Sequence, residues 1–354
     1  MLKFAVPFLA LTLLLPGCAT YERRGLDVAQ AGTLEKKSGL KNYSLTRETE
    51  DRILALDSDH VTAQDVNEVL RRAPAPRLFC IHGGILPAKV NMISLTKFLV
   101  GMGYPEASIR NPSDGTWTFS CYEDADLLAG MVAWFYERDG LRPMLVGHSQ
   151  GGMQVIKILD YLAGPSWSKL EVWNPISWKS EGRWQILDPL GGTNRPVVGL
   201  QLPFAAAMNA GGLGRLMPNQ WAINLRLRTV PDTVEEFTGY YNGKDLLGGD
   251  MFGYGLMNLF HAKNSAKVRN VRLPSTDSHV ETPAAEHLLK SQRIKDWIDH
   301  YQPVATPNQD VTLEFDADSR HLLFAADVWH SIKKHWVLEL QRLIRARRAQ
   351  THER

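Results

Sequence analysis

Cysteine is scarce in this chain, and long apolar segments are missing. Three cysteines occur among 354 residues, with no CxxC pair and no HExxH spacing among the 11 histidines, which argues against a disulfide scaffold and a metal centre. The formal net charge is only +2, so charge predicts neither a nucleic acid nor an acidic partner. No internal repeat or low-complexity stretch is present. What remains is an ordinary globular composition, with 44% hydrophobic residues, that can form a large core by itself.

The most apolar run lies at the N-terminus. Phe4–Leu15 follows Lys3 and is shorter than the roughly 20 residues that a spanning helix needs. It ends in Leu15-Pro16-Gly17-Cys18, which resembles a bacterial lipobox, in which the cysteine is acylated. The resemblance implies a lipoprotein signal peptide over residues 1–18 and membrane anchoring through Cys18. The alternative is an ordinary export signal with a chance cysteine. Ala19 after the cysteine resembles outer-membrane sorting, facing the periplasm, if the host has two membranes.

Beyond this segment, short apolar runs alternate with helical patterns. Alternation of this kind predicts an α/β fold with a mostly parallel sheet covered by helices on both faces. The strands are expected at Arg77–Ile81, near Ala107–Arg110, and at Pro143–Val146, Pro196–Leu202, Glu236–Asn242 and Val268–Pro274. The helices are expected at Val90–Gly101, Tyr122–Arg138 (with Ser120 as N-cap), Gly151–Leu162 and Pro283–His300.

The organisation around this core is less regular. Residues 19–74 are expected to be a tether and lead-in with one helix near Ala63–Arg72, and residues 75–302 the main domain. Cap-like or lid insertions are expected around residues 165–230, where tryptophan, proline and glycine interrupt the pattern and Phe204–Val230 is expected to be partly helical. Residues 303–354 form a C-terminal extension, with a possible strand at Val311–Phe315 and a basic amphipathic helix from Ala325 to about Arg348.

One motif carries chemistry. Gly147-His148-Ser149-Gln150-Gly151 matches G-x-S-x-G, directly after a predicted strand and directly before a predicted helix. A sharp turn between a strand and a helix exposes a serine hydroxyl and directs the N-terminus of the helix toward developing negative charge. This context favours Ser149 as a nucleophile over a glycine-rich turn with an unremarkable surface serine.

With this motif, residues 75–300 resemble the α/β-hydrolase family, and in particular its bacterial lipases and esterases. The order in that family is nucleophile, acid, histidine, with the last two after late strands. The resemblance implies His279 as the base, because it follows the last predicted strand; His261 and His287 are the competitors.

For the acid, the resemblance implies Asp245, which follows a predicted strand through Gly243-Lys244. Asp250 is a close rival and Asp188 a distant one. The turn His82-Gly83-Gly84 resembles the family's oxyanion turn, so Gly84 (or Ile85, if the register differs) and Gln150 are expected to supply the backbone N–H groups that hold an oxyanion.

These residues predict a membrane-anchored serine hydrolase that acts on a small-molecule or lipid carboxylic ester, without cofactor, metal or nucleic acid. An acyltransferase, a thioesterase or an amidase would use the same residues, and a non-catalytic surface lipoprotein would keep only the fold. Two structural alternatives also stay open. The basic C-terminal helix suits either a membrane surface or its own domain, and Cys80 and Cys121 could pair in an oxidising compartment.

Overall fold

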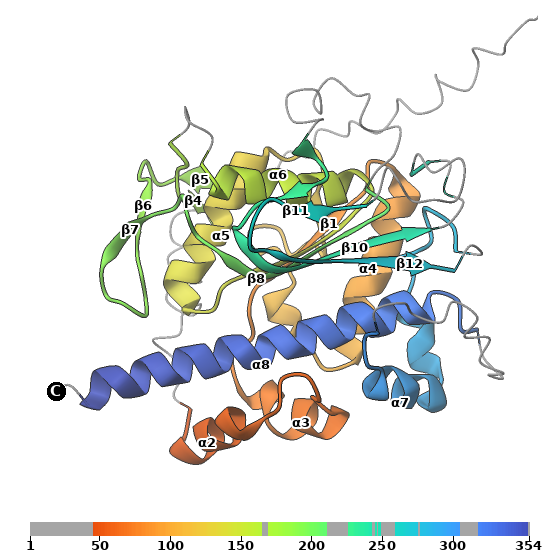
Figure 1. The fold of residues 1–354 in the computed structure, drawn as a ribbon, viewed down its shortest axis with the longest axis horizontal. Helices are drawn as coiled ribbons and strands as arrows, with labels where there is room; N and C mark the ends of the chain where they lie inside the picture. The colour runs from red at the N-terminus through yellow and green to blue at the C-terminus, as the bar shows by residue number, and fades with distance from the viewer. Residues whose placement is uncertain are drawn as a thin grey trace, which may run out of the picture.

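A central sheet of six parallel strands organises the molecule (Figure 1). The structure is a computed structural model that describes residues 45–164, 169–210, 226–242, 245, 247–248, 259–274, 277–304 and 318–352. The strand order is β12-β10-β8-β3-β1-β2, and all five pairings are parallel. The strands are β1 (Leu78–His82), β2 (Phe119–Ser120), β3 (Met144–His148), β8 (Leu202–Met208), β10 (Val234–Asn242) and β12 (Lys267–Leu273). The predicted α/β architecture is therefore confirmed.

Helices cover both faces of this sheet, because side chains of successive strand residues point to opposite sides. Leu78 and Cys80 of β1 pack in the core with α4 (Leu86–Gly101) and α8 (Leu322–His352). Phe79 and Ile81 pack in the opposite core with α5 (Ala125–Asp139) and α6 (Gln150–Leu162). Cys121 belongs to this second core, so it lies on the other face of the sheet from Cys80. This explains why both thiols are free and buried and no disulfide links them.

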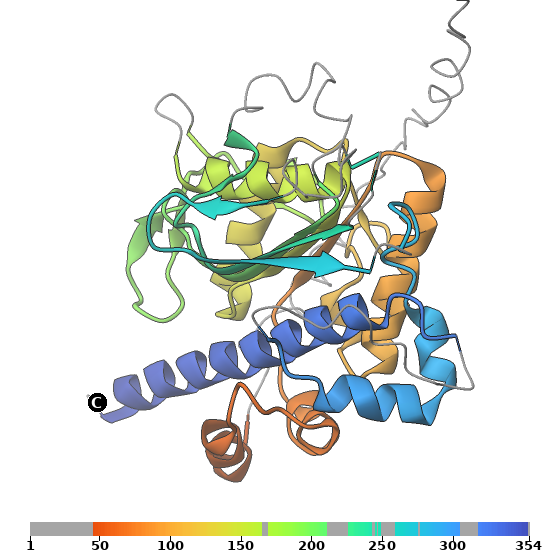
Figure 2. The same ribbon diagram turned by 45° about the vertical axis from the view of Figure 1, so that its right-hand side comes forward.

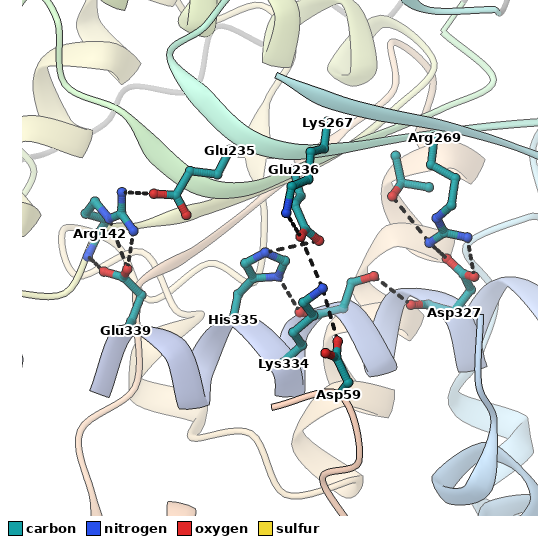
Figure 3. A network of polar contacts seen from close by, with 12 residues as sticks. Asp59, Arg142, Glu235, Glu236, Lys267, Arg269, Asp327, Lys334, His335 and Glu339 are labelled. Carbon is teal, nitrogen blue, oxygen red and sulfur yellow. Dashed lines mark hydrogen bonds and ion pairs between the residues drawn. The ribbon is translucent and has the colours of Figure 1, made fainter. Parts of the chain in front are cut away.

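The C-terminal helix α8 lies along the sheet (Figure 1). Its apolar stripe, which includes Ile332, Trp336 and Leu340, is fully buried in the core of its own domain. Of the two roles left open for this helix, the structure therefore shows docking onto its own domain. Ion pairs join its polar side to the strands and to the loop before β3, as Figure 3 shows for Asp327 with Arg269 and for Glu339 with Arg142.

Two short helices pack on α8 on the side away from the sheet, namely α2 (Arg47–Ala55) and α3 (Ala63–Glu68) (Figure 2). The helix predicted near Ala63–Arg72 is confirmed, as α3 followed by a 3-10 turn at Leu70–Arg72. Thr62 and Asp65 form a capping box at its start. Lys333 of α8 donates a hydrogen bond to the Val61 carbonyl, so this part of the expected lead-in is bound to the domain.

Three predicted elements need correction: one strand was wrong, and two helices are present but begin later than predicted. Residues Glu106–Ser108 form a 3-10 turn rather than a strand, and the edge strand β2 lies further along the chain. Because Ser120 belongs to β2, the helix α5 starts later, after Asp124 as N-cap. The predicted helix Pro283–His300 is a 3-10 turn (Glu286–Lys290) followed by α7 (Gln292–His300), because Ser291 caps a new helix start by accepting a hydrogen bond from Ile294 N.

The fourth correction concerns β8. The strand was predicted at Pro196–Leu202 and partial helix at Phe204–Val230, whereas β8 spans Leu202–Met208. The alanines of β8 favour a helix by intrinsic propensity, but here they allow close packing of α6. A Cβ built on Gly152 of α6 would lie 3.2 Å from the Ala207 Cβ, so larger side chains would not fit. Tertiary packing thus overrides the local preference.

The tryptophan-rich segment forms two antiparallel hairpins, β4–β5 (Trp173–Asn174 and Lys179–Ser180) and β6–β7 (Gln185–Leu187 and Asn194–Pro196). Arg183 is ion-paired to Glu137 near the end of α5, and Tyr136 donates a hydrogen bond to Asp188. The end of α5 leads directly into the first residue of β3. The hairpins, which contact this end of α5, therefore lie at the amino edge of the sheet. Residues 165–168 and 211–225 of the expected insertion, and the strand expected at Val311–Phe315, lie outside the described residues.

Candidate active site

The sharp turn after β3 holds Ser149 at the carboxyl edge of the sheet. Ser149 has φ 54° and ψ −119°, a strained conformation for a residue with a side chain. The turn needs both flanking glycines: a Cβ at Gly147 would lie 2.3 Å from the Gly151 carbonyl oxygen, and one at Gly151 would lie 2.2 Å from the Ile81 carbonyl oxygen. Ser149 N donates to the Met208 carbonyl (2.8 Å), which ties the turn to β8. The serine is half-buried and is the N-cap residue of α6, but its side chain makes no capping hydrogen bond.

Three side chains that are distant in sequence form one chain of hydrogen bonds at this edge. His279 Nδ1 is 2.6 Å from Asp245 Oδ2, and His279 Nε2 is 2.9 Å from Ser149 Oγ. A carboxylate only accepts, so Nδ1 carries the proton and Nε2 is free to accept the proton of Ser149. The second oxygen of Asp245, Oδ1, accepts from Gly248 N (2.6 Å). The Asp245 side chain is 1% exposed and that of His279 is 9% exposed, so both lie out of bulk water.

The rival residues lie elsewhere. His261 contacts Thr229 through Nε2 (3.0 Å) in a small two-stranded sheet of β9 (Thr229–Val230) and β11 (His261–Ala262). His287 faces Asp318 (3.9 Å) near the start of α8. Asp188 lies in the β6–β7 hairpin at the amino edge. Asp250 is outside the described residues. Among the described candidates, only His279 and Asp245 are brought to Ser149.

The turn after β1 lies beside the serine because β1 and β3 are paired, with Ile81 opposite Gly147. A Cβ on Gly83 would be 3.1 Å from Ser149 Cβ, and one on Gly84 would be 2.9 Å from the Gln150 side-chain amide. Tyr122 donates a hydrogen bond to the Gly84 carbonyl (2.8 Å). The structure therefore places Gly84 and Gln150, the two expected oxyanion residues, side by side next to Ser149.

Two supporting residues were not predicted from the sequence. Gly248 must lack a side chain, because a Cβ there would lie 2.2 Å from Asp245 Oδ2. His148, within the motif itself, is fully buried and has its Nε2 2.7 Å from the His279 carbonyl oxygen. Burial, and secondarily the proximity of His279, lowers the pKa of His148 to about 3, so this ring is neutral at ordinary pH. The position of His148 within G-x-S-x-G could have drawn attention to it, but its partner His279 is 131 residues away in the sequence.

No protein-family model matches the chain, and no curated protein matches its sequence. Within the described ranges, no three His, Cys, Asp or Glu side chains are grouped in a way that could hold a metal ion. None of the described helices is long and apolar enough to cross a membrane. The function is therefore inferred from the geometry of the site.

Proposed function

We propose that this chain is a serine hydrolase of the α/β-hydrolase type that cleaves carboxylic esters. The hydrogen-bonded chain Ser149–His279–Asp245 is the observation that supports this most directly. Its members follow β3, β12 and β10, and their order along the sequence is nucleophile, acid, histidine, as in that family. The strained conformation of Ser149 supports the same conclusion, because such strain is concentrated at functional sites.

In the first half of the reaction, Ser149 Oγ attacks the acyl carbonyl while His279 Nε2 takes its proton. Asp245 stabilises the resulting imidazolium and keeps its ring oriented. The negative charge on the former carbonyl oxygen is held by the backbone N–H groups of Gly84 (or Ile85) and of Gln150. Gln150 is the first residue of α6, so the N-terminus of this helix also faces the charge. His279 then gives its proton to the departing alkoxide, and an acyl-serine remains.

In the second half, water attacks the acyl-serine. His279 takes a proton from this water and returns it to Ser149 Oγ as the carboxylic acid leaves. No redox change or external co-reactant is needed for either half. An acyltransferase would differ only in that an alcohol replaces water in this half, and a thioesterase or amidase in the leaving group.

We further propose that the protein is a lipoprotein anchored through Cys18, in a segment outside the described residues. The lipobox-like sequence supports this proposal. Metabolic labelling with a palmitate analogue is expected to mark the wild-type chain and to be lost in Cys18→Ser, while Cys121→Ser, whose thiol is buried in the fold, should keep the label. Equal labelling of wild type and Cys18→Ser would exclude acylation at that residue.

The deciding experiment is hydrolysis of p-nitrophenyl esters of increasing acyl length by the full chain in detergent. Ser149→Ala and His279→Ala should abolish hydrolysis, because the nucleophile and its base act as a unit. His287→Ala is the matched histidine control and should retain it, since this ring lies apart from Ser149. A fluorophosphonate probe should label wild type covalently at Ser149.

The outcomes separate the candidates. Labelled protein that hydrolyses no ester would point to acyl transfer, which added alcohol acceptors would reveal. Folded protein that is neither labelled nor active would contradict the hydrolase proposal and favour a non-catalytic lipoprotein.

A further inference from the structure

The loop that carries His279 is held in an unusual way. Four consecutive backbone carbonyls, those of residues 277 to 280, each accept a hydrogen bond from a side chain. The donors are Asn242 at the end of β10 (2.8 Å), Thr282 of the loop itself (2.8 Å), His148 at the end of β3 (2.7 Å) and Asn91 of α4 (2.9 Å). The position of this loop is therefore set by side chains from three separate elements as well as by its own.

Among these donors, His148 alone adjoins the proposed nucleophile. One peptide bond separates it from Ser149, and its Nε2 is bonded to the backbone of the residue whose own Nε2 reaches Ser149 Oγ. The two imidazole centroids are 5.3 Å apart. This closes a small ring of contacts from Ser149 through His148 and His279 back to Ser149. A shift of the His279 loop away from the serine would break the bond to His148 as well.

The protonation state of His148 follows from its partner. A carbonyl oxygen only accepts, so His148 Nε2 carries the proton and Nδ1 has a lone pair. The ring is 0% exposed and stays neutral, so it adds no positive charge beside the imidazolium that forms on His279. Nδ1 has no hydrogen-bond partner among the described residues and faces Gly83, where a Cβ would lie 3.3 Å away.

This unsatisfied nitrogen bears on the role of the residue. A buried acceptor without a partner destabilises the fold. A leucine would remove this acceptor but would leave the His279 carbonyl without its donor, so the two effects on stability roughly offset each other and stability alone gives no reason for a histidine here. We propose that His148 is a positioning residue, which holds the His279 imidazole at bonding distance from Ser149 Oγ through the His279 carbonyl. This inference rests on the proposed function for its catalytic consequence. The geometric part, that His148 orients His279, can be measured without catalysis.

The experiment compares three variants of the full chain. His148→Leu removes the donor, and His148→Gln keeps a side-chain N–H that can reach the carbonyl. His335→Leu is the matched control: His335 is also buried and donates through Nδ1 to a carbonyl, that of Ser331 (2.8 Å), but it lies in α8, where it stacks on Phe204. Each variant is measured for melting temperature, for kcat and KM on a p-nitrophenyl ester, and for fluorophosphonate labelling rate.

His148→Leu is expected to lower kcat and the labelling rate about 10- to 100-fold, because a small misplacement of a catalytic group has effects of this size. KM and melting temperature should change little. His148→Gln should recover most of the rate, and His335→Leu should keep the wild-type rate per folded molecule. The inference would be overturned if the probe labels His148→Leu as fast as wild type. It would also be overturned if His335→Leu loses as much kcat and labelling rate as His148→Leu.

A readout without catalysis separates this inference from the proposed function. In proton NMR, the downfield resonance of the His279 Nδ1–H that bonds Asp245 should be lost or broadened in His148→Leu and kept in His335→Leu. If wild type is not labelled by fluorophosphonate but this resonance depends on His148, the proposed function fails and the positioning role stands. A resonance that is unchanged in His148→Leu would refute the positioning role whatever the activity.

Discussion

Two regions of this molecule bury charged side chains, and they do so in opposite ways. At the interface between α8 and the sheet, each charge is surrounded by partners (Figure 3). Glu339 is bonded to Arg142 and Arg342, and Asp327 to Arg269, Tyr240 and Tyr301. At the carboxyl edge of the sheet, the polar groups instead form a line that ends at the half-buried hydroxyl of Ser149.

The pKa values reflect the first arrangement. Burial alone would raise the pKa of Glu339, but hydrogen bonds and charge from Arg142 and Arg342 hold it below its usual value. A carboxylate that is saturated in this way has no tendency to exchange protons near neutral pH. A buried charge that is surrounded by partners thus favours stability. In the line from Asp245 through His279 to Ser149, by contrast, the hydroxyl proton of Ser149 can still move to His279. Each of the following changes tests one side of this contrast.

The largest effect is expected from Asp245→Asn. In asparagine, the single amide oxygen would keep the bond from Gly248 N, so the amide NH2 would face His279 Nδ1 and donate to it. The imidazole would then carry its proton on Nε2 and could not take the proton of Ser149, so ester hydrolysis should fall by about 10³- to 10⁴-fold. The melting temperature should move far less than activity does. Asp188→Asn is the control, because Asp188 also accepts backbone N–H groups in a loop but lies at the amino edge. Equal loss in both variants would break the assignment of Asp245.

The reverse pattern is expected for Glu339→Gln. Removing one charge of a buried pair leaves Arg142 and Arg342 poorly compensated, so the free energy of unfolding should fall by about 3–5 kcal/mol, with kcat per folded molecule unchanged. Glu235 pairs with the same Arg142 but its side chain is 42% exposed, so Glu235→Gln should cost below about 1 kcal/mol. Chemical denaturation measures both. A strong loss of kcat in folded Glu339→Gln would erase the contrast between the regions.

A smaller effect is expected on the pH dependence of stability when His330 of α8 is replaced. Burial, and then the neighbouring Lys333, lowers the pKa of His330 to about 4. As the pH falls below about 6.5, the unfolded chain takes up a proton that the folded chain refuses, so stability present above that pH is lost toward pH 4. His330→Gln should flatten this dependence by up to about 1.4 kcal/mol per pH unit.

The readout for His330→Gln is the difference from wild type in denaturation at pH 7, 6, 5 and 4.5. Comparison with wild type is needed because Asp139, whose pKa is raised to about 6 mainly by burial, contributes in the opposite direction. The pH profile of ester hydrolysis should not change in this variant. An unchanged stability slope would show that His330 titrates normally in the fold.

The smallest effect is expected from Gly84→Ala. The added Cβ would meet Tyr122 Oη at 2.8 Å and the Gln150 side-chain amide at 2.9 Å. Both are ends of flexible side chains, so stability should change by less than about 0.5 kcal/mol, while a disturbed oxyanion turn should lower kcat by about tenfold. Gly191→Ala, where the nearest atom is 3.5 Å away, should change neither. If Gly84→Ala keeps the kcat of wild type, the proposed role of Gly84 in holding the oxyanion is wrong.

The sequence alone determined what depends on nearby residues. Short apolar runs predicted β1 and β3, because a strand that is covered on both faces is apolar throughout, and β10 and β12 were also predicted close to their observed bounds. The G-x-S-x-G turn was equally visible, since its glycines relieve clashes with neighbouring backbone. The choice of His279 and Asp245 came from a family resemblance. The structure brings both to Ser149, while their catalytic roles stay a prediction until they are measured.

Only the tertiary structure decided what depends on distant partners. The alanines of β8 form a strand because α6 packs closely on them, which their own propensity opposes. The stripe of α8 docks on the sheet, and its charges find Arg142 and Arg269 roughly 200 and 60 residues earlier in the chain. The bond from His148 to the His279 carbonyl joins residues 131 positions apart. Such contacts have no local pattern, because the chain brings their partners together only when it folds.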